Sequence, residues 1–200
     1  MLLLATHNAG KLAEIRAMLA PLGLRVTSAG EQNIPEPEET ADSFHGNAEL
    51  KARACMLASG YAALADDSGL VIPALGGAPG IYSARWAGAD KDFCVAFDRI
   101  IRELGSPAPT AAYFICVLCL CQPDGRTDFF EGRLHGILTF PPRGENGFGY
   151  DPIFTPDGYS KTLAEFDPAE KNRISHRARA LNKLFTLFSQ KTFLDSVMIG

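Results

Sequence analysis

Residues 111–140 read AAYFICVLCLCQPDGRTDFFEGRLHGILTF, and this stretch decides the fold class. Pro123-Asp124-Gly125 is a turn signal between two long runs of strand-forming residues. The stretch therefore predicts two strands, Ala111–Cys121 and Thr127–Phe140, that form a long hairpin.

Strand–helix–strand segments lie outside this hairpin along the chain. The strand Leu2–Ala5 precedes a helix with an apolar face and then a second strand, Leu24–Ala29. Helix crossovers combined with a hairpin predict an α/β protein with a mixed central sheet and flanking helices. We expect one domain over residues 1–200, with the last ten or so residues unassigned. The other predicted elements are helices over Ser43–Ser59 and Asp90–Leu104, from Asp167 and from about His176, short strands Ala62–Ala65 and Leu70–Ile72, and loops Glu31–Thr40 and Gly76–Gly88.

Composition excludes several classes of partner. The net charge of −4 over 200 residues lacks the basic excess of a binder of polymeric nucleic acid or of membrane surfaces. No apolar run approaches the roughly 20 residues needed to cross a bilayer. The N-terminus has no basic region and is too short for a signal peptide.

Five cysteines are present, and three of them lie within Tyr113–Cys121. Cys116 and Cys119 have a metal-like spacing, but no second pair exists, and residues three apart on a strand point to opposite faces. We interpret them as small buried thiols of a reducing compartment, and expect a cytoplasmic protein.

A first candidate site is Thr6-x-Asn8-x-x-Lys11, where the first strand meets the first helix. Backbone N–H groups and the helix dipole favour an anion there, and Lys11 adds a positive charge. Alone, these residues are more typical of a capped helix with a surface lysine. Asn47 and Lys51 share one face of the second helix, where a solvated polar face is the plainer interpretation.

Adjacent carboxylates in Asp66-Asp67-Ser68-Gly69 are a stronger signal. They follow one short predicted strand and precede another, so we expect them at a turn. Two acids there repel each other unless a cation shields them, and Mg²⁺ holds carboxylates together with substrate phosphates. The acidic loop before the second helix offers a further carboxylate, and Lys11, Lys51 and Arg85 offer cations.

The segment Gly144–Phe154 carries three glycines within six residues, with Phe148 between two of them. A loop that lays an aromatic face on a planar ligand uses this arrangement, and a tight turn with one buried Phe explains it equally well. His176-Arg177 adds cations at the start of the last helix, or is a plain surface pair.

Together, these motifs resemble the inosine/xanthosine triphosphate pyrophosphatase family, in its bacterial form. The resemblance covers almost the whole chain, with the motifs in fixed order. His7 replaces a frequent Gly, Trp86 replaces Tyr or Phe, and the tail after about Gln190 matches no motif. The motifs are Ala5-Thr6-x-Asn8-x-x-Lys11, Glu38-Glu39-Thr40, Phe44-x-x-Asn47-Ala48-x-x-Lys51-Ala52, Asp66-Asp67-Ser68-Gly69, Gly76-Gly77-x-Pro79-Gly80-x-x-Ser83-Ala84-Arg85, Gly147-Phe148-Gly149-Tyr150-Asp151-Pro152-Ile153-Phe154 and Glu170-Lys171-x-x-x-Ser175-His176-Arg177.

The resemblance implies Mg²⁺-dependent hydrolysis of deaminated purine nucleoside triphosphates (dITP/ITP, XTP/dXTP) to the monophosphate and pyrophosphate. It also implies two lobes around a nucleotide-binding cleft, and a homodimer. Glu39 and Asp67 match the metal ligands and Asp67 the general base, with a swap of roles with Asp66 left open. The matching substrate residues are Thr6, His7, Asn8, Ala9, Gly10, Lys11, Lys51 and Arg85 for the phosphates, Ser68 for an unassigned contact, and Phe148, Gly149, Tyr150, Asp151, Lys171, His176 and Arg177 for the base.

Base selectivity is expected to come from hydrogen bonds, because stacking on Phe148 tolerates any purine. The forked donors of Arg177 suit the O6 and N7 acceptors of a 6-oxopurine, whereas adenine sets an amino donor against them. Two rivals stay open. One is a nucleotide-binding regulator that does not cleave, which does not need Glu39 and Asp67 together; the other is a related enzyme for modified pyrimidine or methylated nucleotides.

Overall fold

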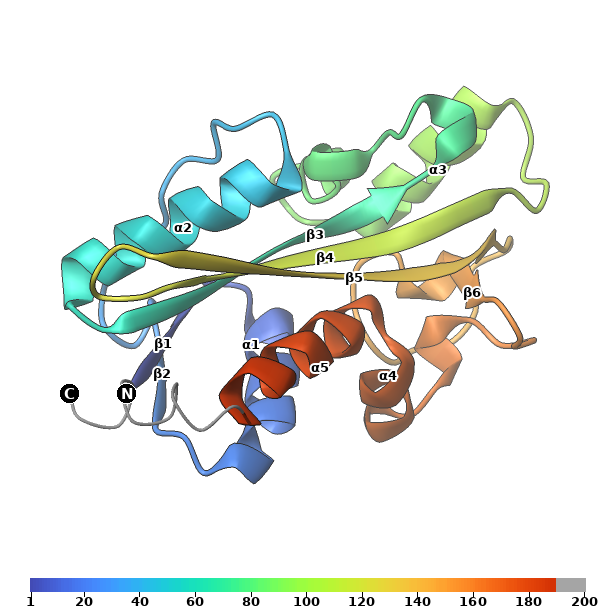
Figure 1. Ribbon diagram of the computed structural model, residues 1–200. Helices are drawn as coiled ribbons and strands as arrows, with labels where there is room; N and C mark the ends of the chain where they lie inside the picture. The colour runs from blue at the N-terminus through green and yellow to red at the C-terminus, as the bar shows by residue number, and fades with distance from the viewer. Residues whose placement is uncertain (190–200) are drawn as a thin grey trace. The chain divides into compact units, whose positions relative to one another are not determined.

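The computed structural model describes residues 1–189, so the unassigned tail after about Gln190 lies outside the described residues. Within them, six strands form one sheet in the order β2-β1-β3-β4-β5-β6 (Figure 1). β1 pairs in parallel with both β2 and β3, whereas β5 and β6 are antiparallel. The predicted mixed sheet is confirmed. The strands are β1 (Leu2–Ala5), β2 (Val26–Ser28), β3 (Ala62–Val71), β4 (Ala111–Cys121), β5 (Thr127–Leu138) and β6 (Phe154–Pro156).

The helices form largely where the sequence predicts them. Asn8 caps α1 (Ala9–Leu19) by accepting a hydrogen bond from Lys11 N, and Ser43 caps α2 (Phe44–Ser59) in the same way through Gly46 N. α3 (Phe93–Leu104) begins later than the expected Asp90, because Asp92 is the residue that caps it. The remaining helices are α4 (Pro168–Ile174), capped by Asp167, and α5 (His176–Ser189).

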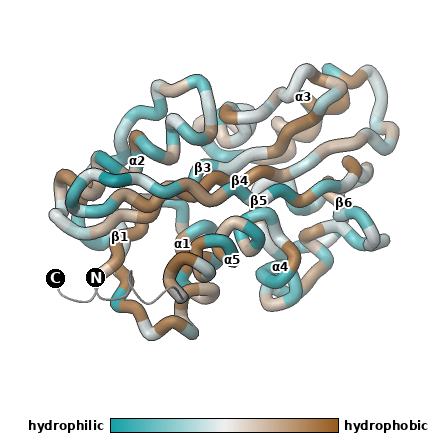
Figure 2. The backbone as a smooth tube through the Cα atoms, viewed as in Figure 1, coloured by the Kyte–Doolittle hydropathy of each residue, from teal (hydrophilic) through white to brown (hydrophobic). Residues whose placement is uncertain are grey.

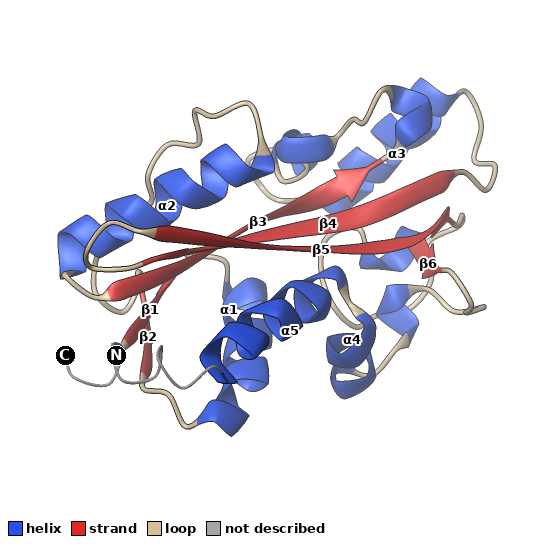
Figure 3. Ribbon diagram, in the orientation of Figure 1, coloured by secondary structure: helices blue, strands red, loops and turns tan. Residues whose placement is uncertain are grey.

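One strand prediction is wrong in an instructive way. Asp66-Asp67-Ser68-Gly69 is not a turn between two short strands but the middle of one continuous strand, β3 (Figure 3). Neighbouring lysine and arginine side chains neutralise the acids there, so the chain does not need to leave the sheet to solvate them. β2 is also shorter than the predicted strand, β5 ends before Phe140, and β6 was not predicted.

The chain forms two compact units, each with its own core. Unit 1 comprises residues 1–67, 116–132 and the segment from 177 onward. Within this unit α2 covers one face of the strands, and α1 and α5 cover the other (Figure 1). Leucines of β1, β3 and β4 pack against Ile15 and Leu19 of α1 and Leu181 and Leu184 of α5. Burial of each such side chain stabilises the fold by roughly 1.5–3 kcal/mol, and Figure 2 shows the hydrophobic run along β1 and β4 in brown.

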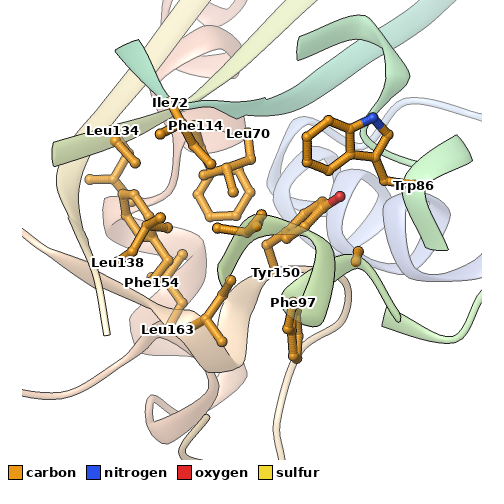
Figure 4. Packing of buried hydrophobic residues seen from close by; sticks show 14 of the residues in the cluster. Leu70, Ile72, Trp86, Phe97, Phe114, Leu134, Leu138, Tyr150, Phe154 and Leu163 are labelled. Atoms are coloured by element: carbon orange, nitrogen blue, oxygen red, sulfur yellow. The ribbon is translucent and has the colours of Figure 1, made fainter. Parts of the chain in front are cut away.

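Unit 2 comprises residues 68–115 and 133–176. Its core is rich in aromatic rings from several elements, among them Trp86, Phe97 and Tyr150 (Figure 4). Phe114 of β4 meets Phe154 of β6 edge-on, with ring centroids 4.7 Å apart. This packing fixes the loop around Tyr150 to the rest of the unit.

The cysteines in β4 are buried thiols, as predicted. Cys116, Cys119 and Cys121 are buried and reduced, and so is Cys55 of α2, while Cys94 at the start of α3 is exposed. Burial is the main cause that raises the pKa of Cys119 to about 12. Among the described residues, no helix has the length and apolar character needed to cross a bilayer.

Candidate functional site

The two central carboxylates of β3 serve opposite faces of the sheet in unit 1, because side chains alternate along a strand. Asp66 follows Ala62 and Leu64, which belong to the core under α1 and α5. Asp67 instead contacts Lys51, which α2 supplies from the other side. Two acids that are adjacent in sequence therefore have separate charge partners.

Asp66 is the centre of a buried polar cluster, and its side chain is fully shielded from solvent. Its Oδ1 lies 2.6 Å from Nζ of Lys11, in the first turn of α1. Its Oδ2 accepts a hydrogen bond from Nε of Arg177 at 2.9 Å and one from the Cys116 thiol at 3.1 Å. A buried carboxylate with this many donors is fixed in place.

Arg177 lies in the first turn of α5 and is 1% exposed. Besides Asp66, its guanidinium donates through Nη1 to Glu14 of α1. Burial lowers the pKa of Arg177, but the two carboxylates outweigh that effect and raise it above its ordinary value. The group is thus a permanent buried cation that ties α5 to α1 and β3.

Lys51 occupies the corresponding position on the other face. Its ammonium donates to Oε1 of Glu39 and to Oδ1 of Asp67, each at 2.7 Å, and to the backbone oxygen of Asp66 at 3.0 Å. Burial lowers the pKa of Lys51, but attraction by Asp67 and Glu39 outweighs it and raises the pKa above its ordinary value. Lys51 is therefore charged and holds both predicted metal ligands together.

Asp67 retains capacity for a cation. Its Oδ2 is buried and has no hydrogen-bond partner among the described residues, which is costly for a carboxylate oxygen. Burial raises the pKa of Asp67, although Lys51 and Lys11 pull it down. An oxygen that is desolvated but unsatisfied is suited to a metal ion.

The donor set fits Mg²⁺ rather than a softer metal. The described residues contain no group of three or more His, Cys, Asp and Glu side chains placed to hold a metal. Mg²⁺ does not require one, because proteins usually supply one or two carboxylates while water and phosphate oxygens complete the shell. Glu39 and Asp67 are the residues that would hold it.

The N-terminal loop combines a helix start with several polar side chains. Asn8 uses its side chain as the α1 cap, and its own N–H donates to the hydroxyl of Thr6 at 3.1 Å. His7 is exposed, and its Nε2 lies 2.9 Å from the backbone oxygen of Ile34. Ala9 and Gly10 open the helix. A helix start of this kind can bind an anion, and the phosphate contact expected there stays a prediction.

Unit 2 brings together a second group of predicted residues. The carboxylate of Asp151 accepts from Phe148 N at 2.8 Å and from Lys171 Nζ at 2.5 Å. The same ammonium lies 4.6 Å from the centre of the Phe148 ring. Phe148 thus has its backbone held by Asp151 and a cation over one face of its ring.

Gly147 is obligatory in this loop. Its φ is +77°, and a Cβ on it would meet Oδ2 of Asp151 at 2.2 Å. Any side chain there would displace the carboxylate from Phe148 and Lys171. Close packing inside the loop thus explains Gly147, whereas Gly149 is explained by its φ of +69°.

The remaining predicted residues have structural contacts of their own. Tyr150 is buried and donates its hydroxyl to the backbone oxygen of Ser83, and His176 stacks on Phe114 with ring centroids 4.8 Å apart. Ser68 is half-buried in β3 after Asp67. Arg85 is exposed, with its guanidinium 5.2 Å from the ring centre of Tyr82.

Two residues that contact the predicted site residues are not identified by the sequence analysis. Glu14 lies one turn after Lys11 on α1, and this i, i+3 spacing was a usable signal of a shared face. Cys116 was classed only as a small buried thiol, although it donates to Asp66. Its role depends on the pairing of distant strands, which its spacing does not reveal.

Comparison with known proteins gives one consistent family. A profile described as the Ham1 family matches residues 2–187. A Rhodospirillum centenum protein named dITP/XTP pyrophosphatase is 57% identical over 186 residues, which cover 92% of each chain. A Gluconobacter oxydans protein of the same name is 51% identical over 195 residues, covering 96% of this chain and 94% of the other.

Solved structures agree with this result. The Staphylococcus aureus Ham1 protein superposes with a TM-score of 0.83 at 36% identity, covering 94% of this chain and 97% of that one. A Mycobacterium abscessus structure titled nucleoside-triphosphatase / dITP/XTP pyrophosphatase gives a TM-score of 0.73 at 40% identity, covering 92% and 96%. The likeness therefore spans both units.

Proposed function

Since this chain belongs to the Ham1 family, we propose that it hydrolyses non-standard purine nucleoside triphosphates, namely dITP, ITP, XTP and dXTP, to the monophosphate and pyrophosphate. In the cell this reaction cleanses the nucleotide pool of deaminated purines. The observation that carries the proposal is the Glu39–Lys51–Asp67 group in a chain 57% identical to a protein named dITP/XTP pyrophosphatase.

Phosphate binding is assigned to unit 1. Lys11 and Lys51 supply positive charge, and the N-terminus of α1 supplies backbone donors, with Thr6 and Asn8 shaping the loop. Charge of this kind acts on groups common to every triphosphate. It therefore contributes affinity and orientation but no choice of base.

Asp67 is assigned to the water that attacks the α-phosphorus. Its carboxylate is buried and held by Lys51, so it is positioned to orient that water and accept its proton. Mg²⁺, when bound by Glu39 and Asp67, supplies neutralisation of phosphate charge. Asp66, whose two oxygens are already engaged by Lys11, Arg177 and Cys116, is unsuited to the same task.

Base recognition is assigned to unit 2. Phe148 stacks on the purine, and Lys171 donates to the 6-oxo group while Asp151 holds its ammonium in place. Lys171 takes this role in place of Arg177, whose guanidinium is bonded to Asp66 and Glu14. Adenine presents an amino donor at that position, so the lysine has no acceptor to bind. Gly149, Tyr150 and His176 shape this region, and Ser68 and Arg85 are further substrate contacts.

A substrate panel tests the function. Pyrophosphate release is measured from ITP, dITP and XTP and from ATP, GTP and CTP, each with Mg²⁺ and with EDTA, and with Asp67→Asn as the inactive control. We expect fast, metal-dependent release from the deaminated purines only. Binding without release would indicate a regulator, and preference for modified pyrimidines would indicate the related enzyme class.

We further propose that the protein works in the cytoplasm as a homodimer. The dimer rests on the family resemblance, and the cytoplasmic location rests on the buried free thiols, which suit a reducing compartment. Light scattering on the purified chain tests the dimer, since a monomeric mass at micromolar concentration contradicts it.

A further inference from the structure

The three donors of the Lys51 ammonium are all engaged inside the protein. An ammonium has three N–H groups, and Lys51 directs them to Glu39, Asp67 and the backbone oxygen of Asp66 at 2.7, 2.7 and 3.0 Å. Its side chain is only 7% exposed. In this arrangement Lys51 has to give up an internal bond before it can bind a phosphate oxygen.

The ammonium contacts the same two carboxylates that are assigned to the divalent cation. It lies on one oxygen of each of the two carboxylates assigned to the metal, while the second oxygen of Asp67 is buried without a hydrogen-bond partner in the described chain. Two carboxylates and one ammonium leave one negative charge. With a dication added, the group becomes positive and repels the ammonium.

Lys11 carries the same charge as Lys51 but contacts a different carboxylate. Its Nζ lies 2.6 Å from Oδ1 of Asp66, on the opposite side of β3, where Arg177 also contacts that carboxylate. Its side chain is more exposed, at 17%. Lys11 therefore adds positive charge near the site without occupying the two metal-binding carboxylates.

We propose that Lys51 is the internal counter-ion of the metal site and competes with the metal for Glu39 and Asp67. Metal binding displaces the ammonium from the carboxylate oxygens, and the displaced ammonium then binds the triphosphate. The inference rests on the proposed function for the identity of the two ligands. It makes the phosphate-binding state of Lys51 a consequence of metal occupancy.

The test measures Mn²⁺ binding to the nucleotide-free protein, by calorimetry, for the parent and for two charge-matched variants. Lys51→Met removes the competitor, so we expect Mn²⁺ to bind more tightly by on the order of tenfold, equivalent to about 1.4 kcal/mol. Lys11→Met removes the same charge from a position that acts on Asp67 without contacting it, so its gain in affinity should be smaller, about threefold or less. Unchanged or weaker binding to Lys51→Met, or equal gains in both variants, overturns the proposal.

A second measurement, of the melting temperature, shows whether the Lys51→Met variant is folded. Without metal, Lys51→Met leaves two carboxylates facing each other, so its melting temperature should fall below that of the parent. Saturating Mn²⁺ should stabilise this variant more than the parent, because no ammonium has to be displaced. An equal metal-induced shift in both proteins contradicts competition.

If Lys51→Met does not fold, Lys51→Gln replaces it in both assays. The amide keeps a donor near Glu39 and Asp67 but removes the charge. Neither assay contains nucleotide, so the outcome is separate from that of the substrate panel. Hydrolysis of ITP by the parent together with equal Mn²⁺ affinities overturns this inference alone.

Discussion

Asp66 and Asp67 are consecutive in β3, yet their carboxylates bind cations on opposite sides of the sheet in unit 1. Asp66 pairs with Lys11 and Arg177, and Asp67 pairs with Lys51. The expected repulsion between the two acids is therefore relieved by separate partners, not by one shared ion. The two positions should consequently respond differently to the same substitution.

Asp67→Asn should abolish most activity while leaving the fold intact. The amide cannot accept a proton from the attacking water and binds a metal more weakly than a carboxylate, so kcat should fall on the order of 10²–10⁴. The ammonium of Lys51 loses one charged partner, so stability should fall modestly rather than rise. Steady-state kinetics with ITP and urea unfolding check both statements, and activity within a few-fold of the parent would sink the assignment of Asp67.

Asp66→Asn should act mainly on stability. The substitution leaves the buried guanidinium of Arg177 short of a counter-charge, and breaking a buried pair costs about 3–5 kcal/mol. Urea unfolding of the two asparagine variants side by side measures the difference. A smaller loss for Asp66→Asn than for Asp67→Asn would contradict the roles given to the two faces.

Lys11→Ala should weaken all triphosphates alike, because its ammonium is assigned to phosphate. The ratio of kcat/KM between ITP and ATP should stay constant while KM rises for both. Kinetics with the two nucleotides at one Mg²⁺ concentration provide the check. A strong change in the ratio would mean that the N-terminal loop reads the base.

Lys171→Met should reduce discrimination, with Arg177→Lys as the comparison. Loss of the Lys171 donor should reduce the preference for ITP over ATP by about 1–3 kcal/mol. Arg177→Lys should lower stability, because a lysine cannot reproduce two directed contacts to Glu14 and Asp66, but should keep the preference. If the preference shrinks in Arg177→Lys and not in Lys171→Met, Arg177 reads the 6-oxo edge as the sequence motif first suggested.

Glu31 provides a pH-dependent prediction away from the site. Its hydrogen bond with Arg16 is the main cause that lowers its pKa from 4.5 to about 2, with help from Ser28 N. A carboxylate whose pKa is lowered by folding stabilises the protein fully at any pH above its ordinary pKa. This contribution disappears as the pH falls through the lowered pKa. Glu31→Gln should therefore melt below the parent at about pH 6, and the gap should close towards about pH 2. A difference in melting temperature that stays constant with pH would contradict a stabilising role for the charge of Glu31.

Sequence reasoning located most elements because their signals are local. Asn8 and Ser43 mark the starts of α1 and α2 as capping residues, and the turn Pro123-Asp124-Gly125 joins β4 to β5. β3 was divided wrongly, because a pair of acids inside a strand is unfavourable unless distant cations are known. Its partners Lys11 and Arg177 are 55 and 111 residues away from Asp66, and no local pattern reveals them.

The candidate site was predicted as a set of residues but not as an arrangement. Family motifs named Lys51, Asp67 and Lys171, and the structure gives each a partner of opposite charge within 2.7 Å. The burial of Arg177 could not be foreseen, because an exposed pair and a buried anchor look alike in sequence at the start of a helix.

The burial of four thiols and the exposure of Cys94 make the protein suited to selective chemical labelling. All five cysteines lie in the described part of the chain, and only Cys94, in the first turn of α3, is exposed. The nearby carboxylate of Asp92 raises the pKa of Cys94, so a maleimide should couple best at mildly alkaline pH. A fluorophore attached to Cys94 would report on unit 2. The four buried thiols would react only when the cores open, so their rates of labelling would measure the rates of unfolding.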